Sequence, residues 1–273
     1  MNMSIDPAET PQVVTVSEGF YVRQAVDNIA WIDLGGFAVA VDALEHAELE
    51  DEVFEAIAST IGETPVRYML NTHTHYDHVA LNAAFRRRYG AEVIDNRSGG
   101  IPAEGRWFKG TRRRAQMIPL GGCHTAEDCI VWIPEDKALF TGDLFGWGLI
   151  PTTRPLDASL AQRLTDAYER MIAFDAVTVI PGHGPLCTTA ELRRWVEYFG
   201  WLRRRCAELC ATGAGDEVSK RLILRLEPHG EIVRELSPPE DMLAWWRFVQ
   251  WKHENSLSKV LQAVRRERLG AQR

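Results

Sequence analysis

Four side chains that can bind a metal ion lie within six consecutive residues, in the segment Thr72-His73-Thr74-His75-Tyr76-Asp77-His78. Imidazole and carboxylate groups hold Zn²⁺ or Fe²⁺ at roughly 2.0–2.2 Å. Crowding such groups together raises the free energy of the folded chain unless a cation offsets their repulsion and desolvation. A polar loop with chance histidines would explain one His-x-His pair, but the adjoining Asp77-His78 pair favours half of a metal site.

Three further candidate ligands occur later in the chain, each after a short apolar run that predicts a strand, with glycine close by. They are His124, Asp143 and His183, which follow the runs 117–120, 138–140 and 177–180. Side chains on loops at one edge of a sheet can converge although they are far apart in sequence. The sequence therefore predicts that these three residues complete the site begun by His73.

The elements that would position these residues alternate between short strands and helices. The first four strands are separated by turn residues and predict an antiparallel meander. Strands are predicted over residues 13–16, 21–26, 29–34, 37–41, 66–70, 91–94, 117–120, 129–133, 138–141 and 177–180. Helices are predicted over 48–61, from Asp77-His78 to about Tyr89, and over 156–173. Residues 95–116 are rich in glycine and predict a long loop, and 134–137 predict a hairpin turn.

The composition changes from residue 188 onward, where 191–211 and 239–268 predict long helices. More than half of the nine tryptophans lie in this part: Trp195, Trp201, Trp245, Trp246 and Trp251. Such helical spacing predicts packing against the body of the protein or a second subunit, with a substrate-pocket wall or lid as the alternative. We therefore expect a catalytic domain over residues 1–187 and a helical C-terminal extension over 188–273 packed on it.

Bulk properties restrict the class of protein. A chain of 273 residues that is 45% hydrophobic can bury a substantial core. The formal net charge of −7 disfavours binding to nucleic acid or to an anionic membrane. Five cysteines without a Cys-x-x-Cys spacing disfavour a disulfide framework. Because the N-terminus shows no signal-peptide pattern and no apolar run approaches about 20 residues, we expect a soluble cytoplasmic protein.

The order His73-x-His75-x-Asp77-His78, His124, Asp143, His183 resembles the metallo-β-lactamase-fold superfamily in its dinuclear hydrolase form, over residues 13–187. The resemblance implies an α+β fold, an αβ/βα sandwich with the site along one edge of two sheets. It also implies two Zn²⁺ ions per chain, with Fe or Mn as alternatives. His73, His75 and His124 would hold one ion, Asp77, His78 and His183 the other, and Asp143 would bridge both. Asp42 matches the early Asp of these proteins, which supports the ligands from behind.

Within the superfamily, the segments around His124, Asp143 and His183 are most similar to the glyoxalase II-like and SoxH-like hydrolases. Two departures separate the chain from glyoxalase II itself. Ala80-Leu81 replaces a Gly-Gly pair after Asp77-His78, and residues 144–148 lack the basic glycine-rich loop. Gly146 stands where acyl-homoserine lactonases have a tyrosine. The resemblance therefore leaves open which small molecule is the substrate.

The implied chemistry is hydrolysis by a metal-bridging hydroxide. Two cations can lower the pKa of a water from 15.7 toward about 7, so that a hydroxide attacks the carbonyl of an ester, thioester, lactone or β-lactam. Asp77 is the candidate to orient that water and carry its proton. Trp107 and Trp147 are candidates for the wall of a substrate pocket, and Arg154 for an anchor of a substrate carboxylate. For each of these three, ordinary packing or surface exposure is the alternative.

Other classes of protein remain as alternatives to the hydrolase. A mononuclear-iron persulfide dioxygenase-like oxidoreductase would hold one iron through His73, His124 and Asp143 alone. A structural zinc site is typically a closed set of four ligands rich in cysteine, unlike this set. A nuclease would need a basic surface, and a binding module without catalysis would not need every ligand position. A small-molecule substrate is the expected partner, and a homodimer would be one use of the tryptophan-rich helices.

Overall fold

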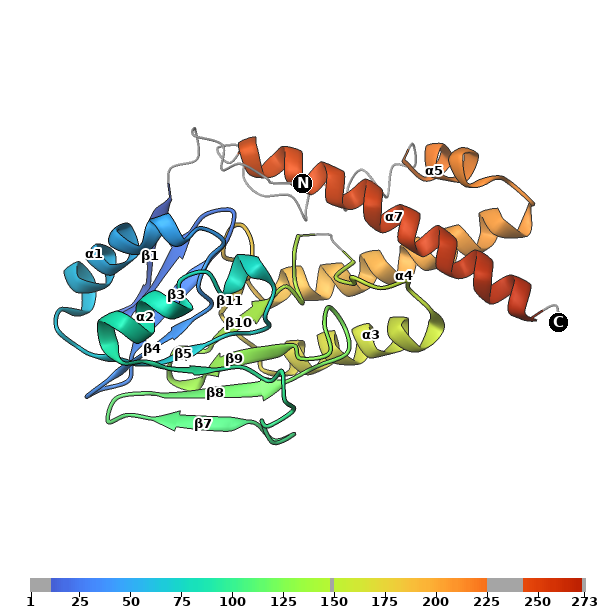
Figure 1. The fold of residues 1–273 in the computed structure, drawn as a ribbon. Coiled ribbons are helices and arrows are strands. Elements are labelled where there is room, and N and C mark those ends of the chain that lie inside the picture. The colour runs from blue at the N-terminus through green and yellow to red at the C-terminus, as the bar shows by residue number, and fades with distance from the viewer. Residues whose placement is uncertain (1–10, 148–149, 225–242, 272–273) are drawn as a thin grey trace.

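The computed structural model describes residues 11–147, 150–224 and 243–271, and side chains over 11–147, 150–223 and 255–270. Two β-sheets lie face to face between outer layers of helices (Figure 1). The first sheet has the order β1-β2-β3-β4-β5-β6, and the second has the order β11-β10-β9-β8-β7. The strands of the first sheet are β1 Gln12–Ser17, β2 Phe20–Gln24, β3 Ile29–Asp33, β4 Ala38–Val41, β5 Val66–Leu70 and β6 Glu92–Ile94. Those of the second are β7 Arg106–Lys109, β8 Arg114–Pro119, β9 Cys129–Ile133, β10 Ala138–Gly142 and β11 Thr178–Pro181.

Alternating apolar residues on the facing strands form the core between the sheets. Val22, Ile32 and Val39 of the first sheet pack in one cluster with Val131 and Phe140 of the second. Because successive side chains of a strand point to opposite faces, the remaining apolar residues of each strand need cover from helices. The sandwich is therefore held by three apolar layers, one between the sheets and one on each outer face.

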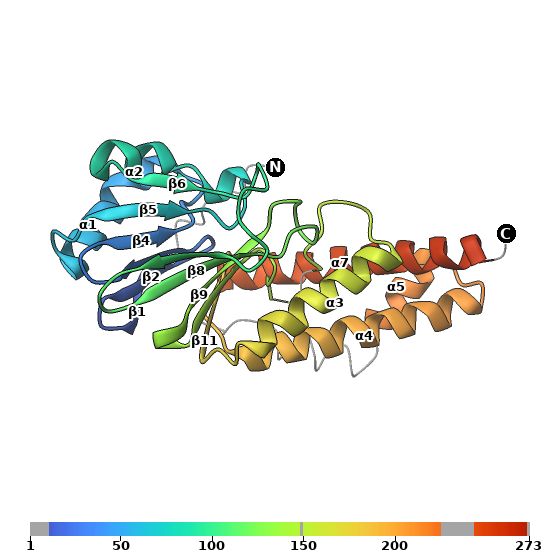
Figure 2. The ribbon, with the colours of Figure 1, turned by 90° about the horizontal axis from the view of Figure 1, so that it is seen from below.

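Helices cover both outer faces of the sandwich. The helices are α1 Glu50–Ile61, α2 Asn82–Tyr89, α3 Ala158–Ala173, α4 Thr189–Ala211, α5 Asp216–Leu224 and α7 Leu243–Ala271, with short 3-10 turns η1 Ala47–Leu49, η2 Tyr76–His78 and η3 Pro134–Asp136. Helices α1 and α2 pack on the first sheet, and α3, α4 and α7 share one core cluster with residues of the second sheet. Figure 2 shows α3, α4, α5 and α7 running past the ends of the sheets as an elongated bundle. The expected αβ/βα sandwich with C-terminal helices is confirmed.

Parallel pairing brings the candidate ligands to one edge. Strand β4 runs parallel to β5 in the first sheet, and β10 runs parallel to β11 in the second. The C-terminal ends of these four strands lead to Asp42, to the segment 72–78, to Asp143 and to His183, respectively. Chain segments far apart in sequence therefore leave the sheets at the same edge of the sandwich.

The structure differs from the sequence prediction at several elements, including β7 and the start of α2. Residues 106–109 form β7, a strand paired with β8, within the stretch expected to be loop. Phe108 of β7 is buried in the core between the sheets, and Trp107 is half-exposed on the other face. Helix α2 begins at Asn82 and not at Asp77, because the backbone N–H groups of Ala80 and Leu81 donate to the carbonyls of residues 44 and 43. That pairing holds the chain after His78 out of helical conformation.

The C-terminal helices pack on the sandwich through aromatic side chains. Trp195 of α4 is buried and stacks on Tyr168 of α3, with ring centroids 3.8 Å apart. The side chains of Trp245, Trp246 and Trp251 lie outside the described residues, so the packing predicted for them stays a prediction. The division of the chain after residue 187 likewise stays a prediction. Among the described helices, none is both long enough and apolar enough to cross a membrane.

Helix α4 begins at a capping box, which gives a test of how the helical extension is anchored. The Thr188 hydroxyl accepts from the N–H of Ala190, and the Glu191 carboxylate accepts from the N–H of Thr188 at 2.8 Å. We expect Thr188→Ala to lower the free energy of unfolding by about 1 kcal/mol, because an N-terminal N–H of the helix loses its acceptor. Urea unfolding measures this change. Thr188→Ser keeps the hydroxyl and should unfold as the wild type does; equal losses in both variants would contradict the capping role.

Candidate metal site

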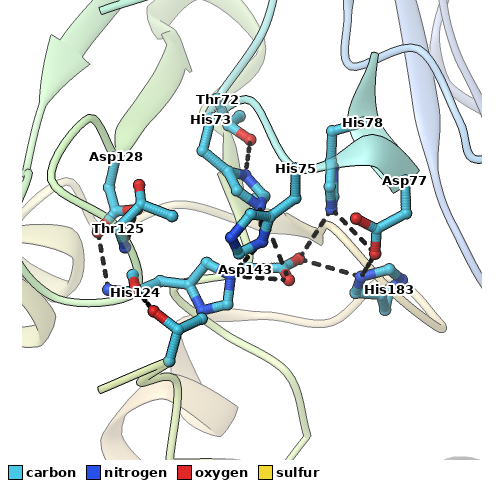
Figure 3. Close-up of polar contacts among 12 residues, drawn as sticks. Thr72, His73, His75, Asp77, His78, His124, Thr125, Asp128, Asp143 and His183 are labelled. Carbon is cyan, nitrogen blue, oxygen red and sulfur yellow. Dashed lines mark hydrogen bonds and ion pairs between the residues drawn. The ribbon is translucent and has the colours of Figure 1, made fainter. Parts of the chain in front are cut away.

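Seven side chains converge at the edge of the sandwich as two groups that share one residue (Figure 3). The first group consists of His73, His75, His124 and Asp143, and the second consists of Asp77, His78, Asp143 and His183. One ligand atom of every member lies within 4.8 Å of the others in its group. The structure thus brings together all the residues that the sequence singled out as metal ligands.

Three ring nitrogens face one another in the first group. The Nδ1 atom of His75 lies 3.1 Å from Nε2 of His73 and 3.0 Å from Nε2 of His124. Bonds of about 2.0–2.1 Å to a tetrahedral zinc ion would separate two nitrogens by roughly 3.3 Å. Three imidazoles cannot satisfy one another with hydrogen bonds alone, since a neutral ring has a single N–H. The spacing fits nitrogens arranged around a cation.

The Asp143 carboxylate stands between the two groups. Its Oδ2 atom lies 3.4 Å from Nε2 of His124, on the side of the first group. Its Oδ1 atom lies 3.3 Å from Nε2 of His78 and 3.2 Å from Nε2 of His183, on the side of the second. One oxygen therefore faces each group, as a bridging carboxylate requires.

The His78 and His183 rings of the second group each make a hydrogen bond through Nδ1, on the side away from the site. The Nδ1 atom of His183 lies 2.9 Å from the Val26 carbonyl, which only accepts, so Nδ1 carries the proton. The Nδ1 atom of His78 lies 2.8 Å from Oδ2 of Asp42. In both rings, Nε2 is then the nitrogen directed at the site, which is the arrangement that metal-binding histidines use.

Asp42 lies behind the candidate ligands and contacts two parts of the 72–78 segment. This fully buried residue has a left-handed backbone, with φ of 59°, and its carboxylate also accepts from the backbone N–H of Thr72 at 2.8 Å. The Thr72 hydroxyl, which donates to the same carboxylate, lies 3.2 Å from Nδ1 of His73. Asp42 thereby positions His78 directly and the start of the 72–78 segment through Thr72.

Burial and charge set the protonation of the groups. Burial lowers the pKa of His73 to about 2 and that of His124 to about 4, so both rings are neutral at pH 7. Burial alone would raise the pKa of Asp143, but the facing His183 and His78 rings hold it well below its usual range. Burial opposes a charge on His78, yet Asp42 and Asp143 outweigh it and raise its pKa well above its usual value. The second group thus has a strong preference for positive charge.

The residues present fit a bound divalent cation. His78 Nε2 and Asp143 Oδ1 are both buried, and neither makes a hydrogen bond of ordinary geometry. Leaving such atoms without partners is costly in free energy, and a metal ion would satisfy both. The donor set contains only imidazole and carboxylate groups, which suit zinc, iron or manganese. Its seven members exceed the four of a closed structural zinc site.

Two acidic residues that the sequence analysis did not select hold the ligand loops in place. Asp128 accepts from the backbone N–H groups of Cys123, His124 and Thr125, at 3.2, 2.8 and 2.7 Å. Glu127 accepts from the N–H and the hydroxyl of Thr74, between the first two histidines. The loop between β8 and β9 therefore fixes His124 and also contacts the 72–78 segment. In the sequence, only the position of Glu127 and Asp128 shortly after His124 could have indicated this role.

Glycine is required where Asp143 and the His183 loop meet. A Cβ atom at Gly182 would lie 2.3 Å from Oδ1 of Asp143 and 2.9 Å from a ring carbon of His78. Asn28 holds the same loop, because its amide donates to the carbonyls of Pro181 and Gly184 at 2.9 and 2.7 Å. Close backbone approach and this amide place His183 beside Asp143.

The three candidate substrate residues have different surroundings. Trp107 lies 39% exposed on β7 with the Arg114 guanidinium 5.4 Å from its ring centroid. Trp147 is buried in the core, and its indole N–H donates to the Pro185 carbonyl at 3.1 Å. Exposed Arg154 donates to the Gly122 carbonyl, two residues before His124. Two of the three therefore contact a loop that carries a candidate ligand: Trp147 contacts the His183 loop, and Arg154 contacts the His124 loop.

Comparison with known proteins agrees with this geometry. Residues 26–120 and 94–183 match the metallo-beta-lactamase superfamily, which covers more than half of the chain. A hydroxyacylglutathione hydrolase of Methylococcus capsulatus is 30% identical over 183 residues, which are 59% of this chain and 69% of that protein. A hydroxyacylglutathione hydrolase of Rhizobium etli is 33% identical over 122 residues, 41% of this chain and only 45% of that protein.

Two solved structures share the fold. A metallo-beta-lactamase from Pontibacter korlensis covers 70% of this chain and 99% of its own, with 22% identity and a TM-score of 0.58. The stereoselective inverting sec-alkylsulfatase Pisa1 from Pseudomonas sp. covers 92% of this chain and 50% of its own, with 14% identity and a TM-score of 0.62. At these identities the likeness concerns the fold alone.

The chain belongs to the metallo-β-lactamase superfamily. Its relatives named as hydroxyacylglutathione hydrolases, together with the two groups of converging ligands, make it a metal-dependent hydrolase of that superfamily. The predicted membership and the predicted similarity to glyoxalase II-like hydrolases are confirmed.

Asp42 provides a test of the second group that does not depend on a substrate. We expect Asp42→Asn to weaken metal binding by about 10–100-fold, because the carboxylate that orients His78 is lost. Asparagine tolerates the left-handed backbone, so the main chain can stay in place. Competition with a chromophoric chelator measures the affinity. Glu92→Gln, an exposed change on the same sheet, is the control, and wild-type affinity in Asp42→Asn would refute the supporting role.

Proposed function

We propose that this protein hydrolyses thioesters, through two zinc ions held by the seven converging side chains. The observation that carries the proposal is Asp143, whose two oxygens face different groups of ligands. A single ion would use only one of them. Iron or manganese would suit the same donors, and zinc is proposed because it accepts imidazole and carboxylate ligands without redox chemistry.

Each group in the proposal has a role. His73, His75 and His124 would hold one ion, Asp77, His78 and His183 the other, and Asp143 would contact both. Two bound cations supply a nucleophilic water of lowered pKa and polarise a carbonyl. Two ions that share seven side chains would keep coordination positions for water and substrate, as catalytic sites do.

Asp77 is the residue proposed to position the water and move its proton. Its Oδ2 atom lies 3.3 Å from Nε2 of His183, and its side chain is 19% exposed. Burial would raise its pKa, but His183 and His78 more than offset this and lower it, so the carboxylate is ionised at neutral pH. An ionised oxygen that faces both the ligands and solvent can accept a hydrogen bond from a water at the site and pass a proton outward.

The relatives support a thioester as the substrate. Both reported relatives are named for hydrolysis of hydroxyacylglutathione, a thioester of an anionic thiol. Arg154 places a cationic side chain beside the His124 loop, where it would attract a carboxylate of such a thiol. Since residues 80–81 and 144–148 depart from glyoxalase II, we propose a related thioester and leave the acyl group open. We also propose that Trp107 and Trp147 form part of the wall of the substrate pocket.

We also propose a cytoplasmic location and a homodimer. All five cysteines are free, which agrees with a reducing compartment. On α5 of the helical extension, Val218 and Leu222 are 50% and 45% exposed, which would suit contact with a second copy of the chain.

Metal content is the first test of the proposal. We expect about two zinc ions per purified chain, and we expect Asp143→Ala to lower this number and to reduce hydrolysis by about 10³-fold or more, because the shared ligand is lost. Elemental analysis and a thioesterase assay measure both quantities. Wild-type protein stripped of metal and reloaded with zinc is the control. One iron per chain with oxygen uptake would instead support the persulfide dioxygenase-like alternative.

The substrate is tested with a panel of carbonyl compounds. We expect kcat/KM for a hydroxyacyl thioester of glutathione to exceed that for an aryl ester, a lactone and a β-lactam by at least about tenfold, which corresponds to about 1.4 kcal/mol of transition-state stabilisation. Arg154→Gln should raise KM for the glutathione thioester and leave KM for the uncharged aryl ester unchanged. Equal rates across the panel would argue against a thioesterase.

A further inference from the structure

Two polar side chains of helix α7 contact the segment 150–154, more than 100 residues earlier in the chain. The buried Ser256 hydroxyl accepts from the backbone N–H of Ile150 at 2.8 Å. The Lys259 ammonium donates to the Thr152 carbonyl at 2.7 Å and to the Ile150 carbonyl at 3.5 Å. In Figure 1, α7 lies alongside α4 in the helical extension. The extension therefore contacts the chain shortly after Asp143.

The same segment holds the loop that carries His124. The Thr153 hydroxyl donates to the His124 carbonyl at 2.9 Å, and Arg154 donates to the Gly122 carbonyl. Internal bonds make the segment compact: the Thr152 N–H donates to the Ile150 carbonyl at 2.8 Å, and the Thr152 hydroxyl to the Arg154 carbonyl at 2.7 Å. A displacement of Thr152 would therefore move Thr153 and Arg154 with it.

We propose that Lys259 and Ser256 are positioning residues, which hold His124 in place for metal binding through the segment 150–154. The connection runs from α7 to the carbonyl and N–H groups of residues 150 and 152, then from Thr153 to the His124 carbonyl. Asp128 holds the N–H side of the same residue at 2.8 Å. The backbone of His124 is thus fixed at both its N–H and its carbonyl.

The identity of residue 259 matters because two carbonyls face one side chain. An ammonium carries three N–H donors and no acceptor, so it can bind both carbonyls at once. Lys259 is half-buried, and burial lowers the pKa of its ammonium group. Charged donors form stronger hydrogen bonds than neutral ones. A methionine of similar length would fill the space and lose both bonds.

Small shifts of His124 would affect metal binding, since ligands must be held within about 0.5 Å of the productive geometry. This inference rests on the proposed role of His124 as a ligand. It does not rest on any substrate, because its test measures metal binding. A failed thioesterase assay with normal effects on metal binding would refute the substrate and leave the positioning role standing.

The first experiment changes the end of the connection nearest to His124. Thr153 is exposed, so Thr153→Val can remove the hydroxyl with little effect on folding. We expect this variant to bind Co²⁺ about tenfold more weakly than the wild type and to show an altered visible absorption spectrum, because a partner that orients a ligand is lost. Thr153→Ser keeps the donor and should restore both the affinity and the spectrum.

The second experiment changes Lys259, at the α7 end of the connection, and then combines this change with Thr153→Val. We expect Lys259→Met to weaken Co²⁺ binding by a similar factor. Changes along one connection are not independent, so the double variant with Thr153→Val should bind about as weakly as the weaker single variant. Leu261→Ala, which opens a cavity in the same helix without removing a polar contact, is the control for general loosening of α7.

Three results would overturn the proposal. They are wild-type Co²⁺ affinity and spectrum in both Thr153→Val and Lys259→Met, losses that multiply in the double variant, and an equal loss in Leu261→Ala. If Lys259→Met does not yield folded protein, the Thr153→Val and Thr153→Ser pair decides the question, because a wild-type affinity in Thr153→Val removes the link to His124.

Discussion

The rest of the site is arranged around one buried carboxylate, that of Asp143. Its two oxygens face imidazole nitrogens of different groups, so every neighbouring side chain is constrained by the need to offset its charge. A buried carboxylate without such partners would be strongly unfavourable. Gly182 contributes by having no side chain, since a Cβ atom there would lie 2.3 Å from Oδ1. Strands β10 and β11 are neighbours in the sheet and run parallel, so Asp143 and Gly182, which follow them, lie side by side.

Neither sheet contains the site alone. The first sheet supplies Asp42 and the segment 72–78, and the second supplies His124, Asp143 and His183. Contacts across the two halves hold them in register: the Cys129 N–H donates to the Thr72 carbonyl at 2.7 Å, and the Asn28 N–H donates to the Gly182 carbonyl at 2.8 Å. The geometry of the candidate ligands therefore depends on the packing of the whole sandwich, because sliding one sheet over the other would separate the two halves of the site.

The convergence of the candidate ligands, with Asp42 behind them, was predictable from sequence, and the supports from Asp128 and Glu127 were not. His73, Asp143 and the other candidates could be selected because imidazole and carboxylate groups after apolar runs have few structural uses, and the structure brings them together. Asp128 and Glu127 act through turn geometry, which only the folded loop reveals. Strand β7 was missed because four residues form a strand here only through pairing with β8. Trp147 shows the same limit, since spacing cannot distinguish a core tryptophan from one that lines a pocket.

The helical extension is linked to the site by two routes with different consequences, one through Tyr168 of α3 and one through residues 150–154. Tyr168 of α3, stacked on Trp195 of α4, donates to the Leu144 carbonyl at 2.6 Å, directly after Asp143. Asp143 belongs to both groups, so loosening this contact would disturb both. The contact of α7 with residues 150–154 leads to His124, a member of the first group alone. Asp42 and the Val26 carbonyl, which orient His78 and His183, belong to the sandwich itself. Loosening of α7 should therefore weaken the first group before the second.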